Sequence, residues 1–428
     1  MNDTSSNRIL HVPRRFVADE WGGTETVILE IARHQQRLGA RPEIMTSMAL
    51  SKCRAESIAG VPVTRFGYTY PFLGLSRADC AMMDKKGGNL LSLSLFRSLL
   101  CRSEVRLYHA HALKRLGGEV RTAARLRKKP FVVSIHGGVF DVPTAERDQM
   151  LKPIANKPEW GKVFGALFGS RRILNDADQV ICVGESEMIL AKKHLDHDRI
   201  TYLPNGVDHA KFARGNRGAF REKHGIPAKA FLALNISRID PQKNQILLLE
   251  AFLRFSKKQP ESFLVMIGPE TQPDYAVRIR EFIATHNLQS KVRLLPGMLN
   301  DSFDLVNAYA ASDVFVLPSR HEPFGIVVLE AWSARCPVIV NHVGGLKTLV
   351  THERTGLFIN PEREGTADEL AAQMQLLASN APLRDQLGCA GSVESLRNYD
   401  WNQIASRLEQ LYQAAEQHAA HRYGKTMK

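Results

Sequence analysis

The sequence predicts an α/β protein with two doubly wound domains in tandem. Short apolar runs alternate with amphipathic stretches along most of the chain, and this alternation stops once, near residues 204–212, before it starts again. Parallel strands need crossover connections that are usually helical, so alternating strands and helices indicate parallel sheets covered on both faces. A chain of 428 residues has room for two such domains, at roughly 100–200 residues per domain.

The first half of the chain begins with a strand that is followed by a helix. Residues 23–38 are predicted to form this helix because apolar residues such as Val27 and Ile31 recur at helical spacing. The predicted strands of this half are residues 8–13, 43–48, 106–110, 131–135 and 179–183. Residues 67–89 contain glycine and show no periodicity, which indicates an irregular loop with a mobile tip.

The break between the halves falls at TYLPNGVDHAKF, where Pro204, Asn205 and Gly206 together mark a turn. The alternation then resumes. The predicted strands are 230–236, 262–267, 292–295, 313–317, 337–340 and 356–359, and the predicted helices are 244–257, 275–287 and 401–417. These elements divide the chain into an N-terminal domain at 1–207, a second domain at 208–397 and a C-terminal helical segment at 398–428.

The composition argues against several classes of protein. The six cysteines are scattered without a CxxC pair, which argues against a zinc ribbon or a disulfide scaffold and favours a reducing compartment. No run of about 18 apolar residues occurs, so no membrane span is predicted. The first residues, MNDTSSNRILHV, lack the basic start and apolar stretch of a signal peptide. We therefore expect a cytoplasmic protein.

The net charge of +13 is unevenly distributed. Residues 1–208 contain 31 Lys and Arg against 22 Asp and Glu, whereas the rest of the chain contains 26 against 22. This excess suggests that the first half faces an anionic partner, for which nucleic acid, a phosphorylated substrate and a membrane surface are candidates. The alternative is a basic surface that is simply solvated.

The candidate site residues come directly after strands, because doubly wound domains bind ligands at the carboxyl ends of their strands. With two such domains, the cleft between them is the expected site. The strongest motif is SRHEPFGIVVLE at residues 319–330, which follows a strand and leads into a helix. Pro323 suits the first helical position, which leaves the next backbone N–H groups free for ligand oxygens. These groups belong to Phe324, Gly325 and Ile326.

The same motif carries two carboxylates. Glu322 lies in the loop, and Glu330 lies two turns further on. A carboxylate near such a helix can accept hydrogen bonds from the vicinal hydroxyls of a ribose. The alternative is that Glu322 caps the helix and that Glu330 is an exposed helical residue.

The second motif is SRIDPQKN at residues 237–244, which directly follows the strand FLALNI. Arg238 and Lys243 are two cations at the end of a strand and before the N-terminus of a helix. This arrangement neutralises a diphosphate and stabilises it as a leaving group. The alternative is a pair of surface cations.

Two further motifs lie in the first half. The paired Gly22 and Gly23 follow the first strand and allow close backbone approach to an anion. No GxGxxG dinucleotide fingerprint follows any strand, which disfavours a dehydrogenase. His136 ends a predicted strand and is placed to meet a substrate. His109 and His111 end the preceding strand, but no Glu-x-x-His pairing or close carboxylate supports a metal site, so we expect a hydrogen-bonding His136 and no metal.

Together these motifs resemble glycosyltransferase family 4, whose members have the GT-B fold of two facing Rossmann-like domains. The resemblance covers nearly the whole chain. It is carried by GGTE at 22–25, SIHGG at 134–138, PNGVD at 204–208, SRIDPQKN at 237–244 and HEPFGIVVLE at 321–330. It implies transfer of a hexose from a nucleotide sugar with retention of anomeric configuration, and a C-terminal helix that crosses back to the first domain. A UDP-sugar is the most expected donor and GDP-mannose the next.

The resemblance also implies a role for each matching residue. Glu330 matches the family glutamate that binds the donor ribose, and Glu322 matches the one beside the donor sugar. Arg238 and Lys243 match the pair that grips the diphosphate, and His136 matches the histidine near the donor sugar. The expected donor-binding positions are Gly22, Gly23, Gly268, Met298, Phe324, Gly325, Ile326 and Glu330.

Two positions depart from the family pattern. Asn244 stands where relatives often have glycine after the lysine, and Pro269 follows Gly268 where many relatives have a glycine pair. Neither change removes a charged residue. In the family, the acceptor hydroxyl attacks on the side from which the diphosphate leaves, and the β-phosphate accepts its proton. The cations then balance the diphosphate, so no metal or other cofactor is expected.

The resemblance implies a glycan or lipid-linked acceptor, in cell-surface polysaccharide or glycolipid assembly. The basic N-terminal domain is expected to allow peripheral contact with an anionic membrane at its inner face, and nucleic acid is not expected as a partner. Two alternatives remain open. One is a nucleotide-sugar epimerase on a similar scaffold, and the other is a non-catalytic carbohydrate-binding protein on a transferase fold.

Overall fold

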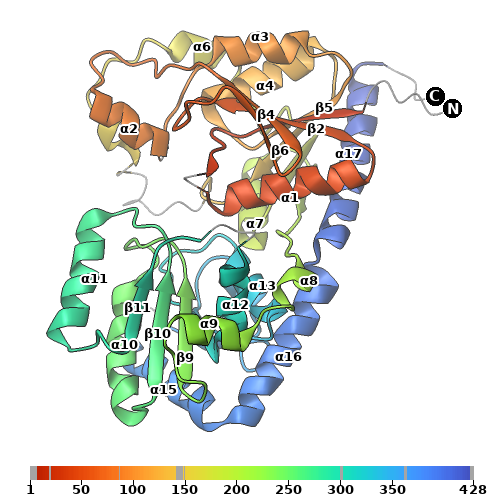
Figure 1. Ribbon diagram of the computed structural model, residues 1–428. Coiled ribbons are helices and arrows are strands. Elements are labelled where there is room, and N and C mark those ends of the chain that lie inside the picture. Colours follow the sequence, from red (N-terminus) through yellow and green to blue (C-terminus); the bar gives the residue numbers. More distant parts are fainter. Residues whose placement is uncertain are drawn as a thin grey trace. The chain divides into compact units, whose positions relative to one another are not determined.

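The computed structural model describes residues 7–18, 21–85, 87–140, 148, 150–298, 302–360 and 364–424. The chain forms two compact units (Figure 1). The first unit extends to Pro204 and also includes the segment from Ile404 onward, and the second comprises Asn205–Gln403. The sequence-based divisions were placed after residues 207 and 397.

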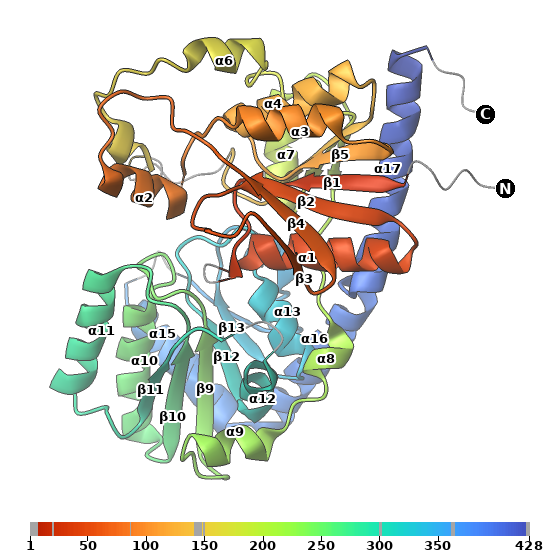
Figure 2. The ribbon, with the colours of Figure 1, turned by 45° about the horizontal axis from the view of Figure 1, so that its top comes forward.

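The first unit contains an eight-stranded sheet with the order β3-β4-β2-β1-β5-β6-β7-β8. Its strands are β1 (Arg8–Val12), β2 (Arg41–Ser47), β3 (Ala55–Ile58), β4 (Val61–Phe66), β5 (Val105–Ala110), β6 (Phe131–Ile135), β7 (Gln179–Cys182) and β8 (Ile200–Tyr202). Neighbouring strands are parallel, except that β3 and β4 are antiparallel. The chain adds strands first on one side of β1 and then on the other, beginning with β5 (Figure 2). The carboxyl ends of β1 and β5 are therefore a topological switch point, where doubly wound sheets bind ligands.

Helices connect these strands. They are α1 (Gly23–Arg37), α2 (Arg77–Lys85), α3 (Leu93–Cys101), α4 (Lys114–Leu126), α6 (Lys162–Leu167) and α7 (Glu185–His194). The prediction of an irregular loop at residues 67–89 is wrong, because this segment contains α2. Only Met83 of α2 is buried, so its sequence lacks the apolar stripe by which a helix is recognised.

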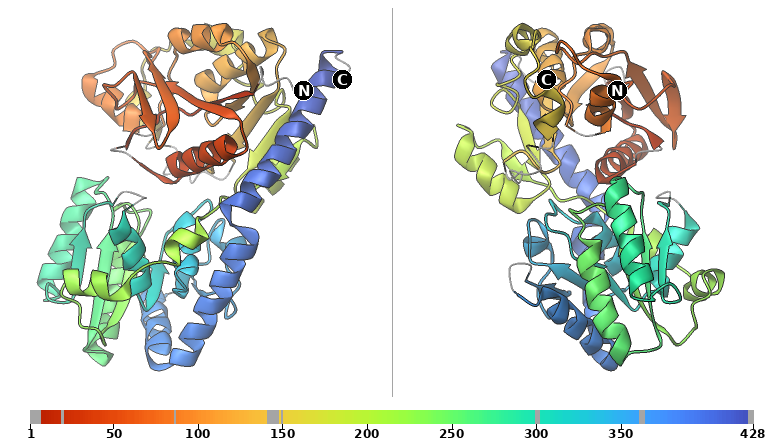
Figure 3. Two further views of the ribbon diagram at one scale, coloured as in Figure 1. Left: turned by 45° about the vertical axis from the view of Figure 1, so that its right-hand side comes forward. Right: turned by 90° about the vertical axis from the view of Figure 1, so that its left-hand side faces the viewer.

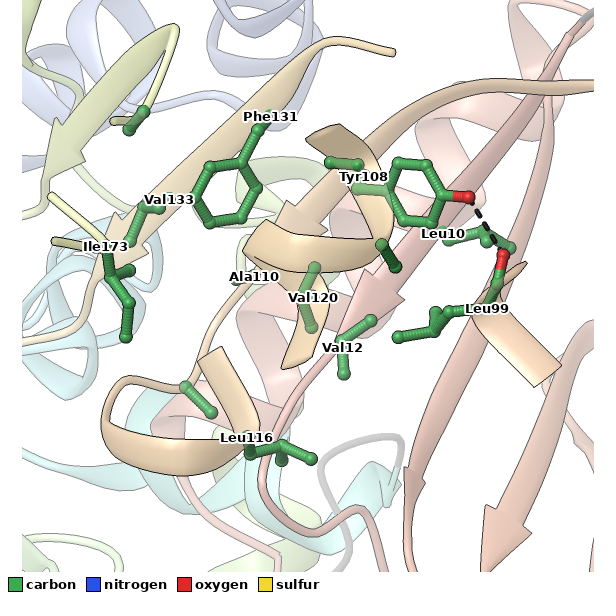
Figure 4. Packing of buried hydrophobic residues seen from close by; sticks show 14 of the residues in the cluster. Leu10, Val12, Leu99, Tyr108, Ala110, Leu116, Val120, Phe131, Val133 and Ile173 are labelled. Carbon is green, nitrogen blue, oxygen red and sulfur yellow. Dashed lines mark hydrogen bonds between the residues drawn. The ribbon is translucent and has the colours of Figure 1, made fainter. Parts of the chain in front are cut away.

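One face of the first sheet packs into the main apolar core of this unit. Figure 4 shows Leu10 and Val12 of β1, Tyr108 of β5 and Phe131 of β6 in this cluster. Successive side chains of a strand point to opposite faces. The residues between these apolar positions therefore face the other side of the sheet, and among them are several histidines.

The last helix, α17 (Trp401–Arg422), joins the first unit from Ile404 onward (Figure 3). Arg106 of β5 donates hydrogen bonds to Glu409 at 2.5 Å and to Glu416 at 2.7 Å. Near the end of the helix, His418 lies 2.6 Å from the carboxylate of Asp178. These charged contacts fix the helix against the strands of this unit.

The second unit contains a six-stranded parallel sheet with the order β11-β10-β9-β12-β13-β14. Its strands are β9 (Phe231–Ile236), β10 (Ser262–Ile267), β11 (Val292–Leu295), β12 (Val314–Leu317), β13 (Val338–Asn341) and β14 (Leu357–Ile359). The strand order reverses between β9 and β12, which makes their carboxyl ends the switch point of this unit. The predicted α/β class with parallel sheets is confirmed in both units.

The helices of the second unit lie before, between and after its strands, and some of them pack with the sheet around a core that includes Leu248, Phe252 and Phe255. They are α8 (His209–Phe212), α9 (Arg217–Lys223), α10 (Gln245–Lys258), α11 (Pro273–Thr285), α12 (Phe303–Ala311), α13 (Ile326–Ser333), α14 (Leu346–Leu349), α15 (Thr366–Ser379) and α16 (Ala381–Asn398).

Candidate functional site

The loops that follow β9 and β12 meet at the switch point of the second unit. Asn235 of β9 donates a hydrogen bond to the carbonyl of Val316 in β12 at 2.8 Å. Beyond the strands, Gln242 accepts a backbone hydrogen bond from Arg320 at 2.8 Å and donates its side-chain amide to the carbonyl of His321 at 3.2 Å. The two motifs that looked strongest in the sequence are thus bonded to each other.

Lys243 and Glu322 form an ion pair across these loops. The Lys243 ammonium lies 2.5 Å from Oε2 of Glu322, and the two side chains are only 13% and 12% exposed. The hydroxyl of Ser319 donates to the same carboxylate oxygen at 3.3 Å. Partial burial strengthens the attraction between the charges but also removes water from both, so a diphosphate that replaces the carboxylate would keep the lysine paired.

Arg238 is more accessible, with 42% of its side chain exposed. Its guanidinium lies 3.3 Å from the carboxylate of Asp240 and donates to the side chain of Gln242 at 3.3 Å. The backbone N–H of Lys243 also points to Asp240, at 3.2 Å. Asp240 therefore holds both ends of this loop, a role that the sequence analysis missed although an Asp-Pro turn was visible there.

Gly268 lets the end of β10 approach the same loop. A Cβ atom at Gly268 would lie 1.8 Å from the carbonyl oxygen of Ser237, so no other residue fits without a shift. A pocket of about 680 Å³ lies beside it at the ends of β10 and β11, and Gly268, Leu294 and Gly297 are among its lining residues. Met298, which follows Gly297, is half-buried.

The helix after Glu322 begins later than predicted. It starts at Ile326, and Gly325 precedes it with φ of +101°. The backbone N–H groups of Phe324 and Gly325 therefore belong to the loop and that of Ile326 to the helix start, and their role toward an anion stays a prediction. The side chain of Phe324 is buried, with its ring 6.1 Å from that of Tyr399.

The late helix start has a tertiary cause. The backbone N–H of Gly345 donates to the carbonyl of Glu322 at 2.8 Å. A Cβ atom would lie 2.3 Å from the Glu322 carbonyl oxygen at Gly344, and 2.2 Å from the Pro323 carbonyl oxygen at Gly345. This glycine pair after β13 allows the two backbones to pack closely, which holds the Glu322 loop in place. The pair was a readable signal of the same kind as Gly22 and Gly23, and the sequence analysis overlooked it.

Glu330 is not an exposed helical residue, because it is only 7% accessible. Tyr309 of α12 donates its hydroxyl to Oε2 of Glu330 at 2.6 Å. Burial raises the pKa of Glu330 to about 7, while the Tyr309 hydrogen bond and the charge of Lys211 act in the opposite direction. Glu330 thus pairs with Tyr309 whereas Glu322 pairs with Lys243, so the two carboxylates of the motif have separate surroundings.

If Glu330 binds the donor ribose, as the family resemblance implies, the KM for the donor should fall as the pH rises through 7, because the deprotonated carboxylate accepts hydrogen bonds from the ribose hydroxyls. Glu330→Gln should raise this KM, flatten its pH dependence and change kcat less, since a ribose contact is equal in the ground and transition states. Steady-state kinetics over a pH series provides the comparison. A collapse of kcat at saturating donor would show that the ribose role is wrong.

In the first unit, Gly22 and Gly23 lie at the N-terminus of α1. The backbone N–H of Gly22 donates to the side chain of Glu25 at 3.2 Å. Burial raises the pKa of Glu25, and Arg15 lies 3.6 Å from its other oxygen. One N–H group of this helix end is thus satisfied by the chain itself, which leaves those of the first turn of α1 for an anion.

His136 directly follows β6 and joins a group of histidines. Its Nε2 lies 2.8 Å from Nδ1 of His111. Nitrogens of His11, His109 and His111 lie within 4.8 Å of one another, a spacing at which three histidines could hold a metal ion. However, both ring nitrogens of all three histidines are already within 3.0 Å of a hydrogen-bond partner. Burial lowers the pKa of His136 to about 4, so it is neutral at physiological pH.

Two family models match the chain. Residues 21–211 match "Glycosyltransferase Family 4", and residues 216–392 match "Glycosyl transferases group 1". Among curated relatives, D-inositol 3-phosphate glycosyltransferase of Rhodococcus jostii is 28% identical over 92% of this chain and 85% of the relative. The UDP-Gal:alpha-D-GlcNAc-diphosphoundecaprenol alpha-1,3-galactosyltransferase of Escherichia coli is 32% identical over 62% of this chain and 65% of the relative.

Solved structures support the fold. HepE of Anabaena, in complex with UDP and glucose, has a TM-score of 0.71 at 18% identity and covers 94% of this chain and 98% of that chain. Sucrose-phosphate synthase of Thermosynechococcus elongatus has a TM-score of 0.71 at 20% identity and covers 95% and 98%. At these identities the likeness shows a shared architecture of two Rossmann-like domains, the predicted GT-B fold.

Proposed function

The chain belongs to glycosyltransferase family 4 and is a glycosyltransferase that uses a nucleotide sugar, and from this premise we propose that it transfers a hexose with retention of anomeric configuration. The observation that carries the proposal is the ion pair of Lys243 and Glu322 at the β9–β12 switch point, with Arg238 beside it. This arrangement offers two cations for a diphosphate and one carboxylate for the adjoining sugar.

The contacts favour a front-side reaction. The diphosphate displaces Glu322 as the partner of Lys243, and the released carboxylate then accepts hydrogen bonds from hydroxyls of the donor sugar. The acceptor hydroxyl attacks the anomeric carbon as its bond to the β-phosphate oxygen breaks, and that oxygen takes the hydroxyl proton. Lys243 and Arg238 stabilise the negative charge that develops on the diphosphate. We assign Glu322 to positioning rather than to covalent catalysis, because the released carboxylate is engaged by the hydroxyls of the donor sugar.

A UDP-sugar is the preferred donor in this proposal, and GDP-mannose is the next. Support comes from the UDP-Gal named for the Escherichia coli relative and from the UDP held by HepE. The pocket beside Gly268 and Gly297 lies next to the Arg238 loop, and its partly apolar lining suits the flat face of a base.

The relatives named above act on two kinds of acceptor, an inositol phosphate and a lipid diphosphate. Both carry phosphate, so we propose a phosphorylated or lipid-linked acceptor in cell-surface polysaccharide or glycolipid assembly. The basic residues between positions 121 and 129 have less charge available for a phosphorylated or lipid-linked acceptor than the sequence alone suggests. Arg121 and Arg125 both pair with Asp176, and Arg127 donates to the backbone carbonyls of Leu100 and Arg102.

A different surface of the first unit fits a membrane better. Val163 and Leu167 are 71% and 69% exposed, and their spacing puts them on one face of α6. Trp160 is exposed just before this helix, and Lys162 and Arg171 are exposed beside it. We name these five residues the α6 surface. Apolar side chains flanked by cations suit the headgroup region of an anionic bilayer. No described helix is both long and apolar enough to cross a membrane.

We expect the double variant Val163→Glu, Leu167→Glu to lose binding to vesicles that contain anionic phospholipid, because it removes apolar area and adds repulsion. Co-sedimentation measures the binding. Leu38→Glu is the matched control, since Leu38 is 62% exposed at the end of α1 and outside the α6 surface. Equal binding by the double variant and the wild type would remove the α6 surface from the proposal.

The function is tested by nucleotide release from UDP-, GDP- and ADP-sugars, with and without inositol phosphate or a polyprenyl-diphosphate sugar. We expect release from a UDP-sugar that depends on an acceptor and survives EDTA, because Arg238 and Lys243 supply the charge that a metal would otherwise supply. Loss of activity in EDTA that magnesium restores would contradict the metal-free part. A new sugar nucleotide formed without acceptor would identify an epimerase instead.

A further inference from the structure

A continuous chain of hydrogen bonds runs through the first unit and ends at His136. Strand alternation puts His11, His109, Ser134 and His136 on the face of the sheet opposite the core cluster. Helices α1 and α17 contribute one side chain each to this face. We call the following seven residues the histidine chain: Ser134, His109, Tyr412, Gln35, His11, His111 and His136.

The first arm of the histidine chain leads from Gln35 to His136. Oε1 of Gln35 lies 2.8 Å from Nε2 of His11, and Nδ1 of His11 lies 3.0 Å from Nε2 of His111. Nδ1 of His111 lies 2.8 Å from Nε2 of His136. Gln35 and His11 are buried, so water cannot substitute for a missing partner there.

The second arm leads from Gln35 to Ser134 through the C-terminal helix. Nε2 of Gln35 donates to the hydroxyl of Tyr412 at 3.0 Å, and this hydroxyl lies 2.8 Å from Nδ1 of His109. Nε2 of His109 lies 2.8 Å from the hydroxyl of Ser134. All four residues are buried. Tyr412 and Gln35 are 377 positions apart, so this arm exists only when α17 is in place.

Proton counting fixes the direction of each bond in the first arm. A neutral imidazole has one N–H donor and one acceptor nitrogen. Burial keeps all four histidines neutral, since it lowers the pKa of each of them. The Gln35 oxygen only accepts, so His11 carries its proton on Nε2 and accepts at Nδ1. His111 must then donate from Nε2 and accept at Nδ1, and His136 must donate from Nε2.

Reversal of the Gln35 amide would reverse the whole histidine chain. His11 would accept at Nε2, and each following histidine would donate from Nδ1. A mixture of the two directions would leave two donors or two acceptors facing each other in a buried place, which costs a hydrogen bond and its desolvation. The chain therefore has two self-consistent states, and they differ at its end by whether Nδ1 of His136 carries a proton.

We propose that Gln35, oriented by Tyr412, determines which nitrogen of His136 carries the proton, and that both are positioning residues for this predicted catalytic histidine. In the observed state, Nδ1 of His136 keeps its lone pair and accepts a hydrogen bond from a hydroxyl of the donor sugar. The role toward the sugar rests on the proposed function, whereas the tautomer does not. A metal held by His11, His109 and His111 would need the nitrogens that these bonds occupy.

The test is two-bond ¹H–¹⁵N NMR of the histidine rings, which reports tautomers in the ligand-free protein. We expect His136 protonated at Nε2 in the wild type and in Gln35→Glu, because a carboxylate only accepts from His11. Gln35→Met and Tyr412→Phe remove the orienting contacts and should give a mixture of tautomers at His136. Tyr108→Phe is the matched control, since this buried tyrosine bonds the Leu99 carbonyl at 2.8 Å on the opposite face of the sheet (Figure 4).

Kinetics adds the functional readout. Gln35→Met and Tyr412→Phe should lower kcat roughly fivefold to tenfold, the effect of about one hydrogen bond, with little change in nucleotide affinity. If the tautomer of His136 is unchanged in both variants, Gln35 does not determine it, and the proposal is wrong even if glycosyl transfer is fully established. Tight zinc binding that shifts the ring signals of His11, His109 and His111 would contradict the proposal and would indicate a metal site instead. If the protein shows no glycosyl transfer but the tautomer of His136 still changes with Gln35, the proposal about the tautomer holds and the proposed function is wrong.

Discussion

Lys243→Ala is expected to lower the rate of transfer by about 100-fold or more while the protein stays folded. Loss of one donor that stabilises developing charge costs on the order of 10²–10³ in rate. Lys243 belongs to a loop after β9, so its removal opens no cavity in the core cluster. Glu322 keeps its hydrogen bond from Ser319, which limits the loss of stability.

Lys223→Ala provides the matched control for this variant. Lys223 also forms an ion pair, with Asp304, but on α9 and away from the two loops of the switch point. Lys223→Ala also removes one positive charge, but it should leave the rate of transfer near that of the wild type. Initial rates and melting temperatures of both variants decide the matter. If Lys243→Ala transfers sugar at a near-normal rate with an unchanged melting temperature, the diphosphate assignment is wrong.

His136→Ala should have the second-largest effect, with transfer lowered on the order of 100-fold through loss of a contact that positions the donor sugar, and with nucleotide affinity nearly unchanged. His136 follows β6 in the first unit, whereas Arg238 and Lys243 belong to the second unit, so the variant leaves the diphosphate cations intact. Loss of an interaction with the sugar in the transition state lowers kcat more than it weakens nucleotide binding.

Calorimetry of UDP binding, together with initial rates, tests this separation. His194→Ala is a suitable control, because His194 bonds the Leu190 carbonyl within α7 of the same unit. The competing interpretation is that His136 only completes the hydrogen bonds at the end of its strand. In that case His136→Ala should lose stability and bind the nucleotide poorly, and the assignment to the sugar would fail.

Local sequence patterns predicted most of the fold. The ranges of β6, β10 and β11 agree with the predicted strands because each is a short apolar run bounded by turn residues. The start of α13 was missed because Gly325 is left-handed and because residues 344 and 345 pack closely against the backbone of Glu322 and Pro323. That contact is far away in sequence, and no local pattern encodes it.

The candidate site shows the same division. The sequence placed Lys243 and Glu322 just after two predicted strands, and they form a pair because the carboxyl ends of adjacent parallel strands meet at one edge. The supporting residues were not predictable in this way. Tyr309 was invisible as a partner of Glu330, and Tyr412 as a partner of Gln35, because each pairing joins two elements only through tertiary packing.

The anomeric configuration of the product tests the central claim most directly. The account holds that the acceptor attacks from the side of the departing diphosphate, with Lys243 and Arg238 on the leaving group and no general base on the opposite face. NMR of the product formed from an α-linked UDP-sugar should therefore show an α-linked product. A β-linked product would contradict the account, because inversion needs a general base on the face opposite the leaving group.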